Sequence, residues 1–380
     1  MRVLVVAMEY PPLMGGGGTY VYNLVQSLSA QGCGVILLTS GEKDESINAN
    51  KNLIEVRSSE LLKLYRGNGN FVVGVDLIIN NLIKYKPDVI HSHHCLEKLL
   101  VHTTNRMFGL PHIETHHKTP QYRQEVGSNA KLALFDFVNT LNCDYYIAPS
   151  QAFEADLIRS GVDRKIIEVS YPGLDPNIYH KILDNDKRLS VLKEKIGISN
   201  DDLLVLIPTV VRKRKGIDFI LKSISRLVMP GKTIKVLITG LDNENYGRMS
   251  KLASPNILVA PKQYSVDEMV CLYCLTNIVV SGTQAEGLGL GLIEALMCEC
   301  PVVATNSIGV NEVIEDEYNG LLSEFGDEDK FSSNILKILT NESLRKYLVG
   351  NGKKVIREKF DQKRQSLDHI RIYDSCLRRH

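Results

Sequence analysis

The sequence predicts an α/β protein of two domains, each a Rossmann-like, doubly wound parallel sheet. Short apolar runs alternate with helical patterns along most of the 380 residues, and this alternation requires parallel strands with helices on both faces. Two of the strand-to-helix turns are rich in glycine. A polar run from about Lys181 to Asp202 has little strand character and separates two such alternations. We therefore expect domains at residues 1–180 and 181–361, and a last helical segment at 362–380.

The composition excludes several classes of protein. Lys and Arg total 45 and Asp and Glu total 44, so no overall field favours nucleic acid or acidic lipid. Apolar residues make up 44% of the chain, as in a globular protein with a large core. No apolar run is long enough to span a bilayer, and the N-terminus lacks the pattern of a signal peptide. These features predict a cytoplasmic protein.

Eight cysteines are scattered along the chain. Cys271 and Cys274 are spaced like half of a zinc site, but no second pair at ligand spacing accompanies them. Both fall where apolar residues recur at helical spacing, so we expect buried thiols rather than a metal or redox site.

The first domain opens with a strand, a glycine run and a helix. Arg2–Ala7 is an apolar run typical of a strand, and Thr19–Leu28 has one apolar helical face. Gly15 to Gly18 lie between them; because each glycine costs folding entropy, we favour close approach of a ligand over a merely flexible loop. Residues 42–52 are polar and predict a surface loop, and Val72–Tyr85 predicts a helix. Further strands are expected at Val35–Thr39, Leu53–Val56, Asp88–His91, Pro111–Thr115, Asp144–Ser150 and Ile166–Val169.

Histidines gather after two of these strands. In such sheets ligands bind beyond the carboxyl ends of the strands. We expect His91, His93 and His94 to be ordinary hydrogen-bonded residues; a zinc site lacks a convincing carboxylate or thiol to complete it. His116 and His117 are better functional candidates, because a neutral imidazole can hydrogen-bond a sugar hydroxyl. Adjacent residues leaving a strand point to opposite sides, so only one of the two should face a cleft.

The second domain repeats the alternation. A basic run, Arg212-Lys213-Arg214-Lys215-Gly216, lies between its first strand and first helix. Strands are expected at Leu203–Thr209, Ile234–Thr239, Ile257–Ala260, Ile278–Ser281 and Pro301–Thr305. Helices are expected at Ile217–Leu227, Phe331–Leu339, Glu342–Lys359 and Gln362–Leu377.

The stretch Thr283–Leu296 is the most informative part of the chain. Glu286 and Glu294 are separated by seven residues that include three glycines, in a pattern of strand, turn and helix. A helix N-terminus favours an anion, and glycines let a phosphate approach the backbone. The carboxylates suit sugar hydroxyls, and the cations of residues 212–215 are placed to clamp a diphosphate. The stretch therefore predicts a nucleotide-sugar site; the alternative is a glycine-rich turn with a surface glutamate at each end.

Taken together, the chain resembles the retaining glycosyltransferases of the GT-B architecture, and most specifically glycosyltransferase family 4, along nearly all of its length. Two Rossmann-like domains facing a central cleft are implied. The resemblance rests on Pro11-Pro12 with Gly15-Gly16, Asp88-Val89-Ile90-His91-Ser92-His93, Pro149-Ser150, Pro172-Gly173-Leu174-Asp175, Lys215-Gly216, Glu286-Gly287-Leu288-Gly289 with Glu294-Ala295, Pro301-Val302-Val303-Ala304-Thr305, Glu312-Val313-Ile314 and Asn319-Gly320-Leu321-Leu322.

The resemblance implies roles for particular residues. Glu294 would bind the ribose hydroxyls and Glu286 the hydroxyls of the transferred sugar, while Lys215 offsets the diphosphate charge. His117 matches the family's donor-contacting histidine, whereas His116 has no such match. The implied donor site consists of Gly15, Gly16, Arg212, Arg214, Lys215, Gly287, Leu288, Gly289 and Glu294. Gly16 would approach the diphosphate from the opposite domain, and residues 362–380 would return to the first domain as a helix.

One departure from the family concerns the cations. Relatives usually place an arginine five residues before the lysine that matches Lys215, and this chain has Val210 there. Arg212 or Arg214 is expected to reach the diphosphate instead.

Two other departures concern turns. Glu299 stands where relatives commonly have a glycine, two residues before Pro301, so we expect that turn to be built differently. Val310, in Gly309-Val310-Asn311, is a looser match than the usual double glycine.

The expected function is retaining transfer of a hexosyl or N-acetylhexosaminyl group from a nucleoside diphosphate sugar, with a UDP-sugar favoured, to an acceptor hydroxyl. Sugars, aminocyclitols, glycans and lipids remain open as acceptors. No cofactor is expected. No Asp-x-Asp motif stands at a convincing strand end, so no metal is expected either. The alternatives are a nucleotide-sugar 2-epimerase of the same architecture and a non-catalytic sugar-nucleotide-binding protein. Residues 61–66 form a weakly basic amphipathic segment, for which a solvated helix is favoured over peripheral contact with a membrane.

Overall fold

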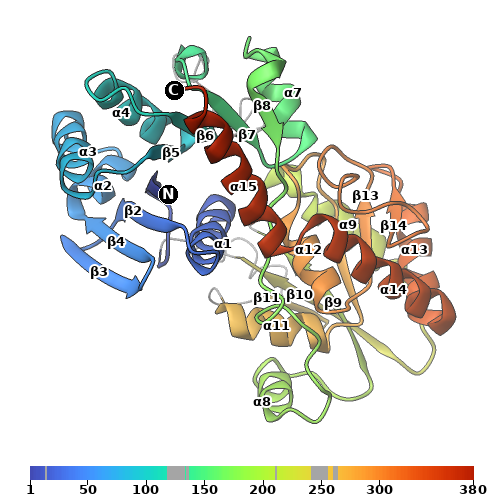
Figure 1. The fold of residues 1–380 in the computed structure, drawn as a ribbon. Coiled ribbons are helices and arrows are strands. Elements are labelled where there is room, and N and C mark those ends of the chain that lie inside the picture. Colours follow the sequence, from blue (N-terminus) through green and yellow to red (C-terminus); the bar gives the residue numbers. More distant parts are fainter. Residues whose placement is uncertain (13–14, 118–132, 134–136, 210–211, 241–255, 260–263) are drawn as a thin grey trace. The chain divides into compact units, whose positions relative to one another are not determined.

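The computed structural model describes residues 1–12, 15–117, 133, 137–209, 212–240, 256–259 and 264–380. The chain forms two compact units. Met1–Gly173 together with Phe360–His380 make the first, and Leu174–Lys359 make the second. Each unit is an α/β domain on one mainly parallel sheet, as the alternation of strand and helix signals predicts (Figure 1).

The sheet of the first unit has the order β3-β4-β2-β1-β5-β6-β7-β8. Its neighbouring strands are parallel except for β3 against β4. The strands are β1 (Arg2–Val6), β2 (Gly34–Ser40), β3 (Glu45–Asn50), β4 (Leu53–Ser58), β5 (Val89–His93), β6 (His112–Thr115), β7 (Tyr145–Ala148) and β8 (Ile167–Val169). The helices are α1 (Gly16–Ala30), α2 (Ser59–Tyr65), α3 (Phe71–Tyr85), α4 (His94–Asn105), α7 (Gln151–Arg159) and α15 (Gln362–Leu377).

The central strand β1 supplies side chains to both faces of this sheet. Val3 and Val5 pack into one core cluster, which α1 and α15 cover. Leu4 and Val6 pack into another, which includes residues of α2, α3 and α4. The period of two along the strand thus builds a core on each face, as expected for a parallel sheet buried on both sides.

The last helix belongs to the first unit. α15 lies beside α1 (Figure 1), and the Ser27 hydroxyl of α1 donates to the carbonyl of Gln362 over 3.0 Å. The Tyr20 hydroxyl lies 3.1 Å from His369 Nε2. Both rings are buried, so this contact ties the end of the chain to its beginning.

The sheet of the second unit is parallel throughout the described strands, in the order β11-β10-β9-β12-β13-β14. The strands are β9 (Asp202–Pro208), β10 (Thr233–Thr239), β11 (Ile257–Val259), β12 (Ile278–Ser281), β13 (Val302–Thr305) and β14 (Leu321–Ser323). The helices are α8 (Lys187–Lys195), α9 (Ile217–Ile224), α11 (Val266–Leu275), α12 (Leu290–Met297), α13 (Glu328–Thr340) and α14 (Glu342–Lys359).

One local expectation for the first unit is wrong. Residues 42–52 were expected to be a loop, but they contain β3, an antiparallel edge strand whose six side chains are all exposed. Because neither face of β3 is buried, its sequence is mostly polar, with only Ile47 and Ala49 as apolar residues. Residues 61–65 lie in the helix α2, as favoured: Lys63 and Tyr65 are exposed, while Leu61 and Leu64 pack in the core.

The turn at Glu299 keeps a glycine-like backbone with a charged residue in it. Glu299 has φ = +61°, the left-handed conformation that glycine favours. The Glu299 carboxylate lies 2.7 Å from Lys353 Nζ on α14. The turn therefore has the backbone conformation typical of glycine, and the Glu299 side chain forms an ion pair with α14.

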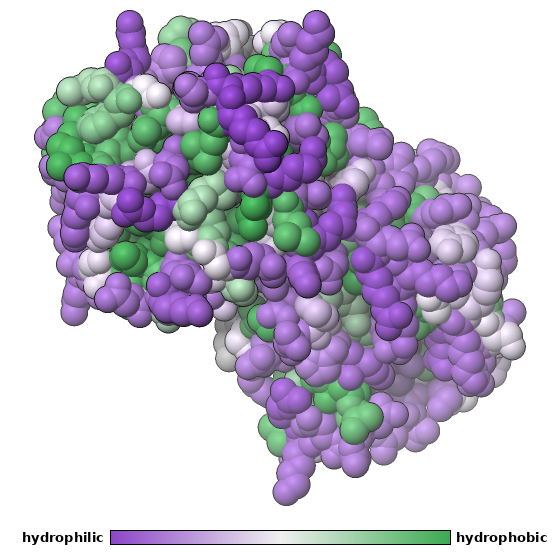
Figure 2. Space-filling view, in the orientation of Figure 1, coloured by the Kyte–Doolittle hydropathy of each residue, from purple (hydrophilic) through white to green (hydrophobic). Residues whose placement is uncertain are grey.

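Most of the face seen in Figure 2 is hydrophilic, with apolar residues gathered over the part of the first unit that holds α3 and α4. Val72 and Ile83 of α3 are 64% and 59% exposed. Within the described ranges, no helix has both the length and the apolar character needed to cross a bilayer.

Candidate functional site

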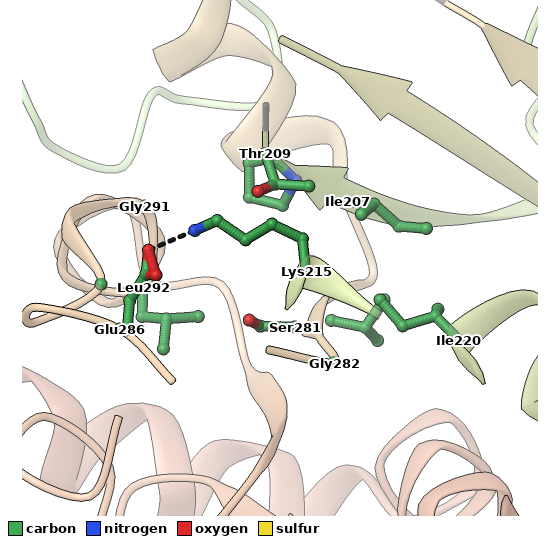
Figure 3. A pocket seen from close by; sticks show the side chains of 12 residues that line it. Ile207, Thr209, Lys215, Ile220, Ser281, Gly282, Glu286, Gly291 and Leu292 are labelled. Atoms are coloured by element: carbon green, nitrogen blue, oxygen red, sulfur yellow. Dashed lines mark hydrogen bonds and ion pairs between the residues drawn. The ribbon is translucent and has the colours of Figure 1, made fainter. Parts of the chain in front are cut away.

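The two central strands of the second unit, β9 and β12, mark the point where the strand order reverses. β10 lies on the far side of β9 and β13 on the far side of β12, so the chain winds away in both directions. Ligands in such sheets bind beyond the carboxyl ends of these two strands. A pocket occupies that place (Figure 3), lined by Ile207, Pro208, Thr209, Lys215, Ile220, Val280, Ser281, Gly282, Glu286, Gly289, Gly291 and Leu292.

Two glycines let the turns after β9 and β12 pack backbone against backbone. Gly216 has φ = +62°, and a Cβ there would lie 2.1 Å from the carbonyl oxygen of Gly282. A Cβ on Gly282 would in turn lie 2.7 Å from Ile220 Cγ1. A larger residue at either position would force the basic turn and the glutamate turn apart.

Lys215, Arg214 and Glu286 meet in this pocket. Lys215 Nζ donates to Glu286 Oε1 (Figure 3). Arg214 Nη1 donates to Glu286 Oε2 over 2.8 Å and to the carbonyl of Ala285 over 3.0 Å. Burial alone raises the pKa of Glu286, but the charges of Lys215 and Arg214 outweigh it, so the pKa lies below its ordinary value. The site therefore holds an ionised glutamate between two cations.

The loop of residues 307–310 supports Glu286 from behind. The Glu286 backbone N–H donates to the carbonyl of Ile308 over 2.9 Å. Gly309 has φ = +84°, and a Cβ there would lie 2.3 Å from the carbonyl oxygen of Glu286. Sequence reasoning noted Gly309 only within a loose motif match and missed this role, although a glycine at a turn is the signal that marks such positions.

The helix α12 begins directly after the glycine-rich turn. Gly289 stands at its N-cap with φ = +86° and has no side chain to cap the first N–H groups. Gly287 is half-buried beside it, and Leu288 is buried. This arrangement leaves main-chain donors at the positive end of α12 next to the pocket.

Glu294 is the fifth residue of α12, in its second turn. The Tyr273 hydroxyl of α11 donates to Glu294 Oε2 over 2.7 Å. Burial raises the pKa of Glu294 to about 7, although hydrogen bonds from Tyr273 and Tyr179 lower it. Burial is the stronger effect here because no positively charged side chain contributes to the pKa shift of Glu294, whereas Lys215 and Arg214 contribute to that of Glu286.

One predicted site residue of the second unit remains, Arg212. Arg212 is exposed at the start of the basic turn. Val210, where the family's arginine is missing, lies outside the described residues. Of the two arginines expected to replace it, Arg214 is the one whose guanidinium bonds Glu286.

In the first unit, His117 follows β6 and stacks among other rings. Its Nε2 lies 2.9 Å from His93 Nδ1, and the two rings are stacked with centroids 5.2 Å apart. His94 and Tyr20 lie on its other sides, with centroids 4.6 and 4.9 Å away. Burial, with repulsion from His94 and His116, lowers the pKa of His117 well below its ordinary value. His117 is therefore a neutral imidazole whose Nε2 is engaged with His93.

His116 belongs to a separate buried network. Its Nε2 lies 3.2 Å from Asp156 Oδ2, and its Nδ1 lies 3.9 Å from Glu114. Lys98 Nζ lies 3.1 Å from the other oxygen of Glu114, and both of these side chains are fully buried. Burial lowers the pKa of His116, but its bonds to Asp156 and Glu114 outweigh burial and raise it. The two adjacent histidines thus have opposite environments, as their position at a strand end predicts.

His91, within β5, is an ordinary hydrogen-bonded residue, as expected. Its two ring nitrogens lie 2.7 Å from the hydroxyls of Tyr373 and Thr115. In the part of the chain that the structure describes, no group of three His, Cys, Asp or Glu side chains is arranged to hold a metal ion.

The glycine run of the first unit lies beside an acidic residue that sequence reasoning missed. Gly15 and Gly16 are exposed at the start of α1. A Cβ on Gly17 would lie 2.6 Å from His94 Nε2 and 3.1 Å from Glu9 Oε2. Glu9 lies three residues after the end of β1, so its place at the carboxyl end of a central strand was the available signal. A side chain at position 17 would have to displace the ends of His94 and Glu9.

Two family models match the chain. "Glycosyltransferase Family 4" matches residues 14–178 and "Glycosyl transferases group 1" matches residues 190–355. The uncharacterized glycosyltransferase MJ1178 of Methanocaldococcus jannaschii is 28% identical over 380 residues, covering 98% of each chain. The alpha-monoglucosyldiacylglycerol synthase of Acholeplasma laidlawii is 23% identical, covering 90% of this chain and 89% of its own.

Solved structures share the whole fold. A sucrose-phosphate synthase from Thermosynechococcus elongatus superposes with a TM-score of 0.83 at 18% identity, covering 100% of both chains. Alr3699/HepE of Anabaena, in complex with UDP-glucose, superposes with a TM-score of 0.76 at 17% identity, covering 99% of this chain and 100% of its own. With both halves matched by glycosyltransferase models and the whole chain by this architecture, the protein belongs to the GT-B glycosyltransferases, with a family 4 domain followed by a group 1 domain.

Proposed function

We propose that the protein is a retaining glycosyltransferase that moves a hexosyl or N-acetylhexosaminyl group from a nucleoside diphosphate sugar to a hydroxyl of a small-molecule, glycan or lipid acceptor. A UDP-sugar is favoured because a protein of the same fold, HepE, binds UDP-glucose. The observation that carries the proposal is the meeting of Lys215, Arg214 and Glu286 at the reversal point of the second sheet, beside the glycine-capped start of α12.

The two cations are suited to stabilise the charge that develops on the diphosphate when the glycosidic bond breaks. In the free protein they are held by Glu286, so the site is already charged and ordered before the donor arrives. We infer that the diphosphate takes over Lys215 and Arg214, with further donors from the main chain at Gly287 and Gly289. Glu286 is then released to accept hydroxyls of the transferred sugar.

Retention follows if the acceptor hydroxyl attacks from the side of the leaving group. The departing phosphate oxygen then takes the acceptor's proton, and no protein carboxylate is needed as nucleophile. His117 would hydrogen-bond the donor sugar through Nδ1 as a neutral group, which agrees with its low pKa. We propose that neither a metal nor another cofactor takes part, so activity should survive EDTA.

Binding is tested by thermal shift with uridine, guanosine and adenosine diphosphates and with UDP-glucose, because a ligand that binds only the folded state raises its melting temperature. The same donors incubated without acceptor separate a transferase from a 2-epimerase, which would convert the sugar nucleotide. NMR of the anomeric proton of the product then gives the stereochemistry. A protein that binds none of these nucleotides, or a product of inverted configuration, would contradict the proposal.

Site residues are tested by three matched variants. Lys215→Met and Glu286→Gln should each lower kcat/KM by about a hundredfold or more, since removing a group that stabilises transition-state charge typically has that effect. Lys213→Met removes the exposed cation in the same basic turn and should change kcat/KM less than threefold. A loss in Lys213→Met as large as that in Lys215→Met would show that the basic turn acts through its total charge alone.

A further inference from the structure

Tyr273 is a buried tyrosine whose hydroxyl bonds the side chain of Glu294. It lies on α11, the helix that precedes β12, and is only 1% exposed. Its hydroxyl donates to Glu294 Oε2 over 2.7 Å, on the helix that follows β12. Burying a hydroxyl costs free energy unless it is hydrogen-bonded, so a phenylalanine would fill the same space without that requirement. The hydroxyl therefore points to a role in holding the carboxylate.

The Tyr273 hydroxyl also reaches the wall of the pocket. Gly291 lines the pocket, and a Cβ on Gly291 would lie 3.5 Å from the Tyr273 hydroxyl oxygen. The Tyr273 hydroxyl therefore lies behind Gly291 in the wall of the pocket, one helical turn before Glu294. Glu294 as a residue is half-buried, and its carboxylate lies on the same helix as the pocket-lining Gly291.

A second phenol contacts the same carboxylate. Tyr179, near the start of the second unit, is 6% exposed and hydrogen-bonds Glu294. A carboxylate offers about four acceptor positions on its two oxygens. Two phenols therefore fix its orientation and still leave acceptor positions for two neighbouring hydroxyls, which is the arrangement that a ribose presents.

We propose that Tyr273 is a positioning residue for the donor: its hydroxyl holds Glu294 so that the carboxylate accepts both ribose hydroxyls, and binding of the nucleotide expels any proton that Glu294 carries. This inference rests on the proposed function. It adds an acid-base step at the nucleotide end of the site, away from the bond that breaks.

The expected pH dependence follows from the burial of the carboxylate. Glu294 has its pKa raised to about 7 by burial, so near neutrality a fraction of the free protein carries the proton. Ribose hydroxyls donate to the ionised form, so nucleotide affinity should fall as the pH drops below about 7, approaching tenfold per pH unit. Tyr273→Phe removes a bond that favours ionisation, so it should weaken binding about tenfold and move this fall to higher pH. The kcat should change little, because Tyr273 touches no reacting atom.

The experiment is isothermal calorimetry of UDP, GDP and ADP binding to the full-length protein at pH 6.5, in buffers of different ionisation enthalpy. The dependence of the observed heat on the buffer gives the number of protons released. The wild type should release a sizeable fraction of a proton, Tyr273→Phe should release more and bind less tightly, and Glu294→Gln should release none from this group. Tyr347→Phe, a substitution at a 54% exposed tyrosine of α14, is the matched control and should equal the wild type.

The outcomes separate the inference from the function on which it rests. If none of the three diphosphates binds the wild type, the proposed function fails and this inference fails with it. If a diphosphate binds but the wild type, Tyr273→Phe and Glu294→Gln release the same number of protons, only the inference is overturned. A 2′-deoxy-UDP probe gives a second check: Tyr273→Phe should weaken its binding less than that of UDP, and an equal loss would assign Tyr273 a merely structural role.

Discussion

Replacing Glu294 by Gln should change how stability depends on pH. The folded protein holds the Glu294 proton up to a pKa of about 7, whereas the unfolded chain loses it near the ordinary value of 4.5. Between these values the folded state binds more protons, so raising the pH removes stability in this window. The difference is about two and a half pH units, which corresponds to up to about 3 kcal/mol at about 1.4 kcal/mol per unit. Glutamine keeps an acceptor for Tyr273 and carries no titratable proton.

The measurement is urea unfolding at pH values from 5 to 8, followed by far-ultraviolet circular dichroism because the chain has no tryptophan. Relative to the wild type, Glu294→Gln should gain free energy of unfolding as the pH rises from about 5 to 7.5, and the gain should level off above that. Glu315→Gln, at an exposed position of the same unit, is the control and should run parallel to the wild type. Parallel curves for wild type and Glu294→Gln would refute the argument that burial governs this carboxylate.

Three further predictions concern other parts of the fold. In Gly309→Ala the new Cβ would lie 2.3 Å from a backbone oxygen at a residue with positive φ, so the free energy of unfolding should fall by about 2 kcal/mol or more. The control Gly326→Ala has a positive φ but open space around it and should lower the free energy of unfolding by about 1 kcal/mol. Equal losses in urea unfolding would contradict the steric argument. Lys98→Met strands the buried carboxylate of Glu114 and should cost about 3 to 5 kcal/mol; adding Glu114→Gln should recover part of that loss, and a double variant no more stable than the single one would count against the ion pair. Burial lowers the pKa of His369 to about 4, so its contribution to stability is complete above about 6.5 and is lost as the pH falls toward 4; His369→Gln should flatten acid unfolding in that range, and an unchanged acid transition would disprove this.

The sequence predicts most of the parallel sheets because buried strands have apolar runs that neighbouring helices interrupt. β1 and β9 are clear examples, since every residue from Val3 to Val6 and from Leu204 to Ile207 is buried. β3 shows the limit of this approach. An edge strand with six exposed side chains is held by main-chain hydrogen bonds to one neighbour, and such bonds leave no mark in the side-chain pattern.

The same distinction applies to the site. The sequence could single out Glu286, Glu294 and Lys215 as candidates, because a charged residue in or just after a glycine-rich strand-to-helix turn adds little to packing, and their binding roles stay a prediction. It could not single out Tyr273, because in sequence this residue is one apolar position of a helix, and only the packing of α11 against α12 brings its hydroxyl to a carboxylate.

The glycines show which contacts are invisible before folding. A side chain at Gly309 would clash with the carbonyl of Glu286, more than twenty residues away in the chain, and one at Gly216 would clash with the carbonyl of Gly282. A positive φ can be expected from a glycine in a turn, but the backbone atom that excludes a side chain depends on how two distant turns pack together.

The place of α15 in the first unit has a consequence for biosynthesis. Phe360–His380 are synthesised after Leu174–Lys359, yet they complete the earlier unit. During synthesis Tyr20 and His91 therefore lack their partners His369 and Tyr373. The second unit is fully synthesised before the first has all the residues of its fold. A nascent chain arrested before Phe360 should thus expose the α1 side of its first core to chaperones and proteases, whereas its second unit has every residue that it needs.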